Sequence, residues 1–182
     1  MKTLVVCYSL TGKTRAIAQA MAETVGADYV EMKEIFPYTM VSAYTRGAIK
    51  ARKRHNEDIL PVQADVSEYD CVIVAGPIWA SSPAPALYDF IREYDLKGKQ
   101  AYGLLTYRGK AGGAAKILRE ELENAKSLCR SVITVKADKD TVRAFVSRKL
   151  SFAMQEDGKI ILEKETTPDL QEASDEAGSG RE

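Results

Sequence analysis

Five apolar runs of strand length alternate along the chain with stretches in which apolar residues recur at helical spacing. The runs are residues 2–8, 27–32, 71–76, 98–106 and 129–136. The helical stretches that follow them include 15–22, 86–91, 114–125 and 138–150. Strands and helices that alternate in this way fold as a parallel sheet with helices on both faces. The pattern therefore predicts an α/β, doubly wound, five-stranded parallel sheet.

Residues 34–60 interrupt this alternation. An aromatic loop over 35–38 precedes a predicted helix over 42–55, in which Tyr44, Ala48 and Ala51 fall near one face. The other positions of this helix carry cations at Arg46, Lys50, Arg52, Lys53 and Arg54. Such a basic face is either solvated surface, or a site for an anionic partner or for the phosphates of NAD(P)H. The chain has no groove-binding motif, so we expect no nucleic-acid partner.

A hydroxyl-rich turn, Ser-Leu-Thr-Gly-Lys-Thr at residues 9–14, joins the first strand to the first helix. A strand that turns directly into a helix leaves unpaired N–H groups and the positive end of the helix dipole at the turn, and together these bind anions. The three hydroxyls add donors, and the glycine allows a ligand to approach closely. The turn therefore predicts a phosphate-binding loop. A nucleotide-hydrolase loop is disfavoured, because it needs a glycine where this chain has Cys7.

Two further loops follow apolar strands. Residues 76–85 contain three prolines, which oppose helix formation, and the only tryptophan, Trp79. Residues 107–113 contain three glycines, which let the backbone approach a ligand closely. Ligands of doubly wound sheets bind beyond the carboxyl ends of the strands, where all three loops are expected to meet.

The three loops, in this order, resemble those of the flavodoxin family. Residues 9–14 match the family pattern Ser/Thr-x-Thr-Gly-x-Thr, which holds the phosphate of FMN. The 76–85 loop resembles the one that places an aromatic beside the isoalloxazine ring, and 107–113 resembles the third FMN loop. The resemblance covers residues 1–150 and implies the strand order 2-1-3-4-5. The cofactor-binding residues that it implies are Ser9, Leu10, Thr11, Gly12, Lys13, Thr14, Pro77, Ile78, Trp79, Ala80, Ser81, Thr106, Tyr107, Gly109, Gly112 and Gly113.

The resemblance implies an FMN-binding redox protein in which the flavin supplies the chemistry and no side chain acts as acid or base. Its function would be electron transfer to a redox partner protein, or NAD(P)H-dependent reduction of a small quinone-like acceptor. A flavin-free interaction module on the same fold stays open, because a fold does not fix a function. Residues 77–81 contain no glycine, so positive φ angles there would cost energy. This restraint favours two-electron chemistry over one-electron carriage.

Charge divides the chain into a basic body and an acidic end. Residues 163–182 hold seven acidic and two basic residues, a net charge of −5. The whole chain has 26 of each sign, so residues 1–162 carry +5. Residues 151–166 are expected to be an extension, and 167–182 a disordered tail that lacks the apolar residues of a core.

The cysteines and the single histidine, His55, do not form a metal motif. The three cysteines are not at metal-ligand spacing, and one histidine excludes a histidine cluster. Reduced thiols indicate a cytoplasmic protein. No apolar run approaches the length of a membrane span, which is about 18 residues or more.

Overall fold

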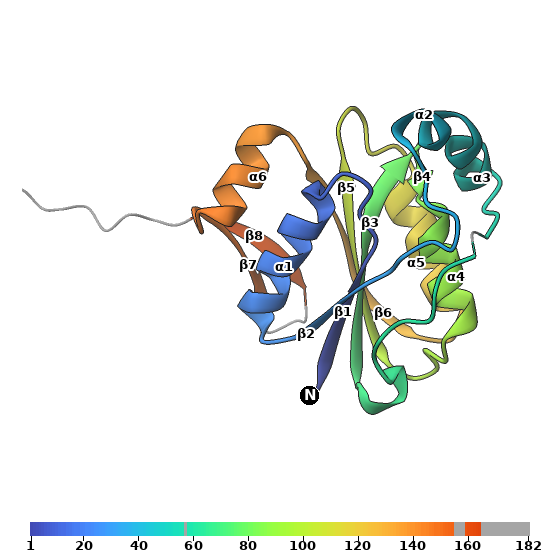
Figure 1. Ribbon diagram of the computed structural model, residues 1–182. Helices are drawn as coiled ribbons and strands as arrows, with labels where there is room; N and C mark the ends of the chain where they lie inside the picture. The colour runs from blue at the N-terminus through green and yellow to red at the C-terminus, as the bar shows by residue number, and fades with distance from the viewer. Residues whose placement is uncertain (57, 155–158, 165–182) are drawn as a thin grey trace, which may run out of the picture.

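Five parallel strands form the central sheet in the order β2-β1-β3-β5-β6 (Figure 1). The computed structural model describes residues 1–56, 58–154 and 159–164. The strands are β1 (Thr3–Cys7), β2 (Asp28–Glu31), β3 (Cys71–Trp79), β5 (Gln100–Tyr107) and β6 (Leu128–Lys136). Counted along the chain without the two-residue β4 (Ser82–Pro83), this order is 2-1-3-4-5, which confirms the predicted topology.

The inner strands are buried on both faces, as their continuous apolar sequences predict. β1 is buried along its whole length, and so are the first six residues of β3. β3 pairs with β1 on one side and with β5 on the other, both in parallel register. The segments that leave β1, β3 and β5 therefore emerge together at one edge of the sheet.

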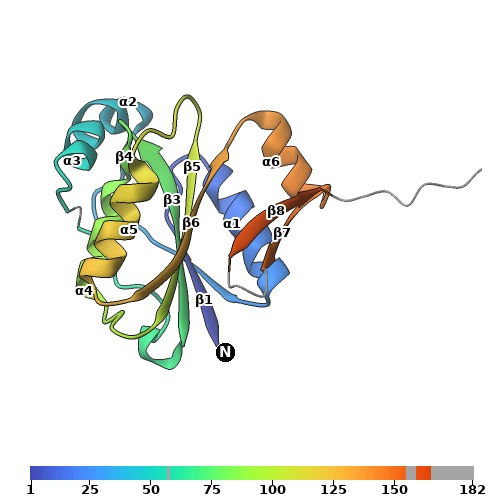
Figure 2. The same ribbon diagram turned by 180° about the vertical axis from the view of Figure 1, so that it is seen from behind.

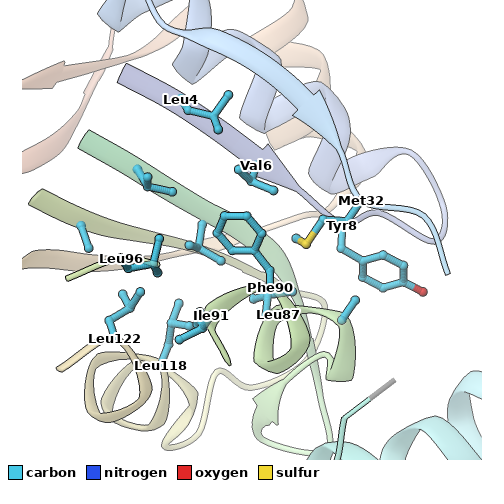
Figure 3. Packing of buried hydrophobic residues seen from close by; sticks show 14 of the residues in the cluster. Leu4, Val6, Tyr8, Met32, Leu87, Phe90, Ile91, Leu96, Leu118 and Leu122 are labelled. Carbon is cyan, nitrogen blue, oxygen red and sulfur yellow. The ribbon is translucent and has the colours of Figure 1, made fainter. Parts of the chain in front are cut away.

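Helices cover both faces of the sheet (Figures 1 and 2). α4 (Pro85–Glu93) and α5 (Ala114–Asn124) lie on one face, and α1 (Lys13–Val25) and α6 (Lys139–Val146) lie on the other. Because side chains alternate along a strand, Leu4 and Val6 point toward α4, while Val5 and Cys7 point toward α1. Figure 3 shows the first of these two cores, in which apolar side chains of β1 face Leu87, Phe90 and Ile91.

The inserted segment is helical from Met40 to Arg52 but contains one wide turn. It comprises α2 (Met40–Ser42), the π-helical turn η1 (Ala43–Gly47) and α3 (Ala48–Arg52). Its buried residues are Ala43, Gly47 and Ala51, at a spacing of four. Of the three residues predicted to share a face, Ala51 is buried and Tyr44 is 67% exposed.

The chain after α6 adds a hairpin to the α1 face. β7 (Leu150–Met154) pairs antiparallel with β8 (Ile160–Lys164), and the Phe152 ring stacks on Phe145 with centroids 4.8 Å apart. The predicted final helix ends at Val146 instead of 150, and Asp138 caps its start by accepting a hydrogen bond from Thr141. The short 3-10 helix η2 (Val66–Glu68) precedes β3.

The predicted disordered tail, 167–182, lies outside the described residues. None of the helices in the described ranges has the length and apolar character needed to cross a bilayer.

Candidate functional site

A pocket of about 390 Å³ opens at the carboxyl edge of the sheet. It lies between the segments that follow β1, β3 and β5 and the inserted helical segment. Most of the residues predicted from the sequence line it, namely Leu10, Thr11, Lys13, Thr14, Pro77, Ile78, Trp79, Ala80, Ser81, Thr106, Tyr107 and Gly109. The other four, Ser9, Gly12, Gly112 and Gly113, are adjacent in sequence but do not line it.

The 9–14 loop presents donors that have no partner within the described part of the chain. Gly12 caps α1 with a φ of 80°, a conformation that favours glycine, and no side chain caps the helix. The first N–H groups of α1 therefore lack intrahelical acceptors. The buried Ser9 hydroxyl also has no hydrogen-bond partner among the described residues. A bound anion at this helix end would satisfy these groups, so the loop fits a phosphate.

A hydrogen bond between Thr14 and Thr106 links this loop to the end of β5. Their hydroxyl oxygens lie 2.7 Å apart, and both residues are buried. Each hydroxyl has one proton, so one proton makes this bond and the other stays available to a ligand. The pair thus fixes the first loop against the third and keeps one donor.

Lys13 does not behave as the lysine of a nucleotide-hydrolase loop. Its ammonium donates a hydrogen bond to the carbonyl of Ala137, 3.0 Å away, just beyond β6. This contact ties the start of α1 to the β6–α6 connection. Lys13 therefore adds positive charge to the pocket while its position is set by the protein backbone.

The 76–85 segment is a tight hairpin, which the sequence did not predict. β3 continues to Trp79, which pairs with Ser82, so Ala80 and Ser81 form a two-residue turn. Their φ angles are 49° and 64°, where non-glycine residues are strained. The expectation that this glycine-free segment avoids positive φ is therefore wrong. The strain exists in the resting structure, so it no longer supports a preference for two-electron chemistry.

The same hairpin touches the third loop. A Cβ added to Gly112, whose φ is 57°, would lie 2.6 Å from the Cβ of Ser81. Only glycine fits at position 112, because its φ is positive and because a side chain would collide with Ser81. Gly112 therefore brings the second and third loops together, although it does not itself line the pocket.

Trp79 lines the pocket and also anchors the inserted segment. Its ring meets Tyr8 and Tyr38 edge to face, with centroids 5.8 and 5.1 Å apart. On a third side it fills the space beside Gly47, where an added Cβ would lie 2.7 Å from the ring atom Cζ3. The tryptophan therefore holds the wall formed by residues 40–48 against the hairpin.

The pocket is cationic. Lys13, Arg108 and Lys110 line it, and no acidic residue among those that the structure describes does so. Cys7 lies at the end of β1, but burial raises the pKa of its thiol to about 12, so it stays protonated and unreactive at neutral pH. The site therefore favours anionic ligands and contains no ionised thiol that could take part in redox chemistry.

Seven lining residues were not predicted as cofactor-binding: Met40, Ala43, Tyr44, Ala48, Arg108, Lys110 and Ala137. Four of them belong to the inserted segment, whose helix was predicted but not its place over the pocket. Arg108, Lys110 and Ala137 follow strands whose carboxyl ends lie at this edge. Because ligands of doubly wound sheets bind beyond the carboxyl ends of the strands, these three residues could have been predicted from the sequence.

Comparison with known families agrees with this geometry. The family model described as Flavodoxin matches residues 2–149. The chain belongs to the flavodoxin family. As a member of this family it is an FMN-binding redox protein, and a flavin-free module is set aside. No curated protein matches the chain in sequence.

Solved structures share the flavodoxin fold. A candidate flavoprotein from Bacteroides eggerthii has a TM-score of 0.67 at 23% identity, over 81% of this chain and 96% of that one. A Lactobacillus acidophilus flavoprotein in complex with FMN has a TM-score of 0.58 at 18% identity, over 79% and 97%. Megasphaera elsdenii flavodoxin has a TM-score of 0.52 at 15% identity, over 80% and 98%. At these identities the likeness concerns the fold.

Proposed function

We propose that this flavodoxin-family protein uses FMN to reduce a small quinone-like acceptor with electrons from NAD(P)H. The observation that carries the proposal is the pocket lining, which joins three cations and no acid to an apolar wall. NAD(P)H is an anion through its phosphates, and a quinone is flat and apolar. A site with this lining can attract the first and accommodate the second.

The residues of the 9–14 loop would hold the FMN phosphate. The unpaired N–H groups of α1, the Ser9 hydroxyl and the free proton of the Thr14–Thr106 pair are the donors for it. FMN, when bound, supplies the redox chemistry. No side chain needs to exchange a proton with the substrate.

The other parts of the site would orient the ligands and limit water. The strained turn at Ala80 and Ser81 is braced by Gly112, so this side of the pocket is held in place. Met40 and Tyr44 form the opposite, apolar wall. Arg108 and Lys110 are exposed at the rim, where a negatively charged nucleotide would meet them first.

Anaerobic titration of the FMN-loaded protein with NADH and NADPH tests this proposal. We expect one equivalent of nucleotide to bleach the flavin, and added 2-methyl-1,4-naphthoquinone to restore its colour with steady turnover. The double variant Arg108→Gln/Lys110→Gln should raise KM for the nucleotide. The matched control is Lys97→Gln/Arg130→Gln, because both of these exposed cations lie near the amino ends of strands.

A flavin that neither nucleotide reduces, and that dithionite reduces in two resolved one-electron steps, would contradict the proposal. That result would identify the protein as an electron carrier instead. A KM that rises equally in the control variant would show that the effect of Arg108 and Lys110 is one of overall charge.

A further inference from the structure

The edge of the sheet that carries the pocket is rich in basic residues. Four of the segments that meet there, residues 8–22, 35–56, 71–88 and 101–118, contain no aspartate or glutamate, whereas β2 ends at Glu31 and Asp138 follows β6. The chain as a whole has 26 acidic and 26 basic residues, so its charge is strongly segregated. A phosphate at the 9–14 loop accounts for the charge near α1, but not for that of residues 46–54 and 108–110.

Several cations on this edge are exposed and unpaired. The side chains of Arg52, Lys53, Arg108 and Lys110 make no ion pair or hydrogen bond within the part of the chain that the structure describes. Arg54, by contrast, pairs with Glu120 at 3.1 Å and anchors the end of the inserted segment. The four unpaired cations are therefore not needed to hold the fold together and can meet an external anion.

Large apolar side chains are exposed beside these cations. Phe36, Val41, Tyr44 and Ile49 are 65%, 75%, 67% and 57% exposed. Met40 is also exposed, and both Met40 and Tyr44 line the pocket. Of the exposed large apolar residues in the described part of the chain, more than half lie between residues 35 and 49. The mouth of the pocket thus borders an apolar surface.

We propose that this apolar and cationic face, formed by residues 36–53 and the 108–110 loop, docks on a bilayer that contains anionic phospholipid. Along the inserted helix, apolar and cationic residues are interleaved: Val41, Tyr44, Arg46, Ile49, Arg52 and Lys53. This is the composition of helices that lie in the interface of anionic membranes. A protein interface, in contrast, tends to exclude lysine from its core and to keep charge at its rim.

The arrangement of the elements allows a flat surface to reach the whole face. In Figure 1, α2 and the loop that follows β5 stand at the same end of the molecule. The pocket lies between them, because both segments contribute to its lining. A membrane at this end would bring the pocket mouth to the lipid surface, where apolar acceptors dissolve. The docking proposal does not require the redox proposal to be correct.

Vesicle flotation of the FMN-loaded full chain tests the proposal. The vesicles are phosphatidylcholine alone, or phosphatidylcholine with about one third phosphatidylglycerol. We expect binding to the anionic vesicles only, and weaker binding as salt is raised. Each cation near an anionic leaflet adds about fivefold to partitioning, so Arg52→Gln/Lys53→Gln should weaken binding about 25-fold. Val41→Ser/Ile49→Ser should weaken it at all salt concentrations.

Matched controls remove the same groups elsewhere. Lys97→Gln/Arg130→Gln removes two exposed cations at the opposite edge of the sheet, and Leu128→Ser/Val146→Ser removes two exposed apolar side chains outside the face. Both controls should bind vesicles as the unmodified protein does. FMN affinity and circular dichroism show whether each variant is folded. The salt dependence of vesicle binding by the unmodified protein tests the electrostatic part of the proposal without any variant.

Equal binding to neutral and anionic vesicles, or equal losses in the controls, would overturn the proposal. Absence of vesicle binding would also overturn the proposal, and would indicate an acidic protein as the partner of this face. None of these results would affect the titration with NAD(P)H, so the two proposals fail independently.

Discussion

Replacing Gly47 with alanine tests whether Trp79 fixes the wall of the pocket. Gly47 has helical angles, φ −63° and ψ −42°, so helix propensity alone predicts a gain of about 1 kcal/mol from alanine. Close packing around Gly47 predicts a loss of stability instead. The new Cβ would lie 2.7 Å from Cζ3 of Trp79 and 3.1 Å from Cε1 of Tyr38. Since carbon atoms pack at about 3.5 Å or more, the ring or the helix must move by about 0.8 Å.

The cost of such overpacking is about 1–3 kcal/mol, and the middle of this range, about 2 kcal/mol, exceeds the propensity gain by about 1 kcal/mol. We therefore expect Gly47→Ala to lose about 1 kcal/mol of stability, or about 2–4 °C in Tm. Because the displaced helix carries Met40 and Tyr44, FMN affinity should fall roughly tenfold, or about 1.4 kcal/mol. Thermal unfolding and flavin fluorescence titration measure the two effects.

A control and a rescue make the result specific. Gly109 also borders the pocket, but an added Cβ there meets no protein atom within 4 Å, so Gly109→Ala should leave Tm nearly unchanged. Replacing Trp79 by the smaller phenylalanine in the Gly47→Ala background should restore part of the lost stability. If Gly47→Ala instead raises Tm and leaves FMN affinity equal to that of the unmodified protein, the reasoning from close packing is refuted.

Three further outcomes follow from the described contacts. Ala80→Gly should raise Tm slightly, because relief of about 1–2 kcal/mol of strain exceeds the entropy cost of glycine, about 0.4–1 kcal/mol; an unchanged or lower Tm would contradict the strained turn. Gly112→Ala should destabilise by about 2 kcal/mol or more, and Ser81→Gly should recover part of this loss in unfolding experiments. Burial raises the pKa of Cys7 to about 12 and that of Cys71 to about 11, so the unfolded thiols ionise first. Stability should therefore fall between about pH 9 and pH 11, by about 1.4 kcal/mol per pH unit for each thiol, and the slope should flatten in Cys7→Ala/Cys71→Ala.

The topology followed from the sequence because the strands have a simple apolar pattern. The continuous run at 71–76 marked the central strand, and the half-polar run at 27–32 marked an edge strand. The 9–14 loop was recognisable because the chemistry of anion binding needs hydroxyls and a glycine at a helix start. Each of these patterns lies within one short segment of the chain. In the structure the 9–14 loop lies at the carboxyl edge of the sheet, as expected.

The parts that were missed depend on contacts between distant segments. The π-helical turn at 43–47 allows Gly47 to meet Trp79, and no local pattern encodes that meeting. Met40 and Tyr44 line the pocket, a placement that the sequence did not predict. The turn at Ala80 and Ser81 contradicts local φ preferences, and its contact with Gly112 joins segments about thirty residues apart. Tertiary packing overrides local preference at these places, which lie around the pocket.

The central claim is that the 9–14 loop holds the phosphate of FMN. Calorimetric titration of the apoprotein with FMN and with riboflavin, which lacks the phosphate, tests it most directly. Thr11→Val/Thr14→Val removes two hydroxyls while it keeps the side-chain shape, and each hydrogen bond to a charged group is worth about 1.5–3 kcal/mol. We predict that FMN affinity falls about a hundredfold or more and that riboflavin affinity changes little. Equal losses for the two ligands would contradict the assignment.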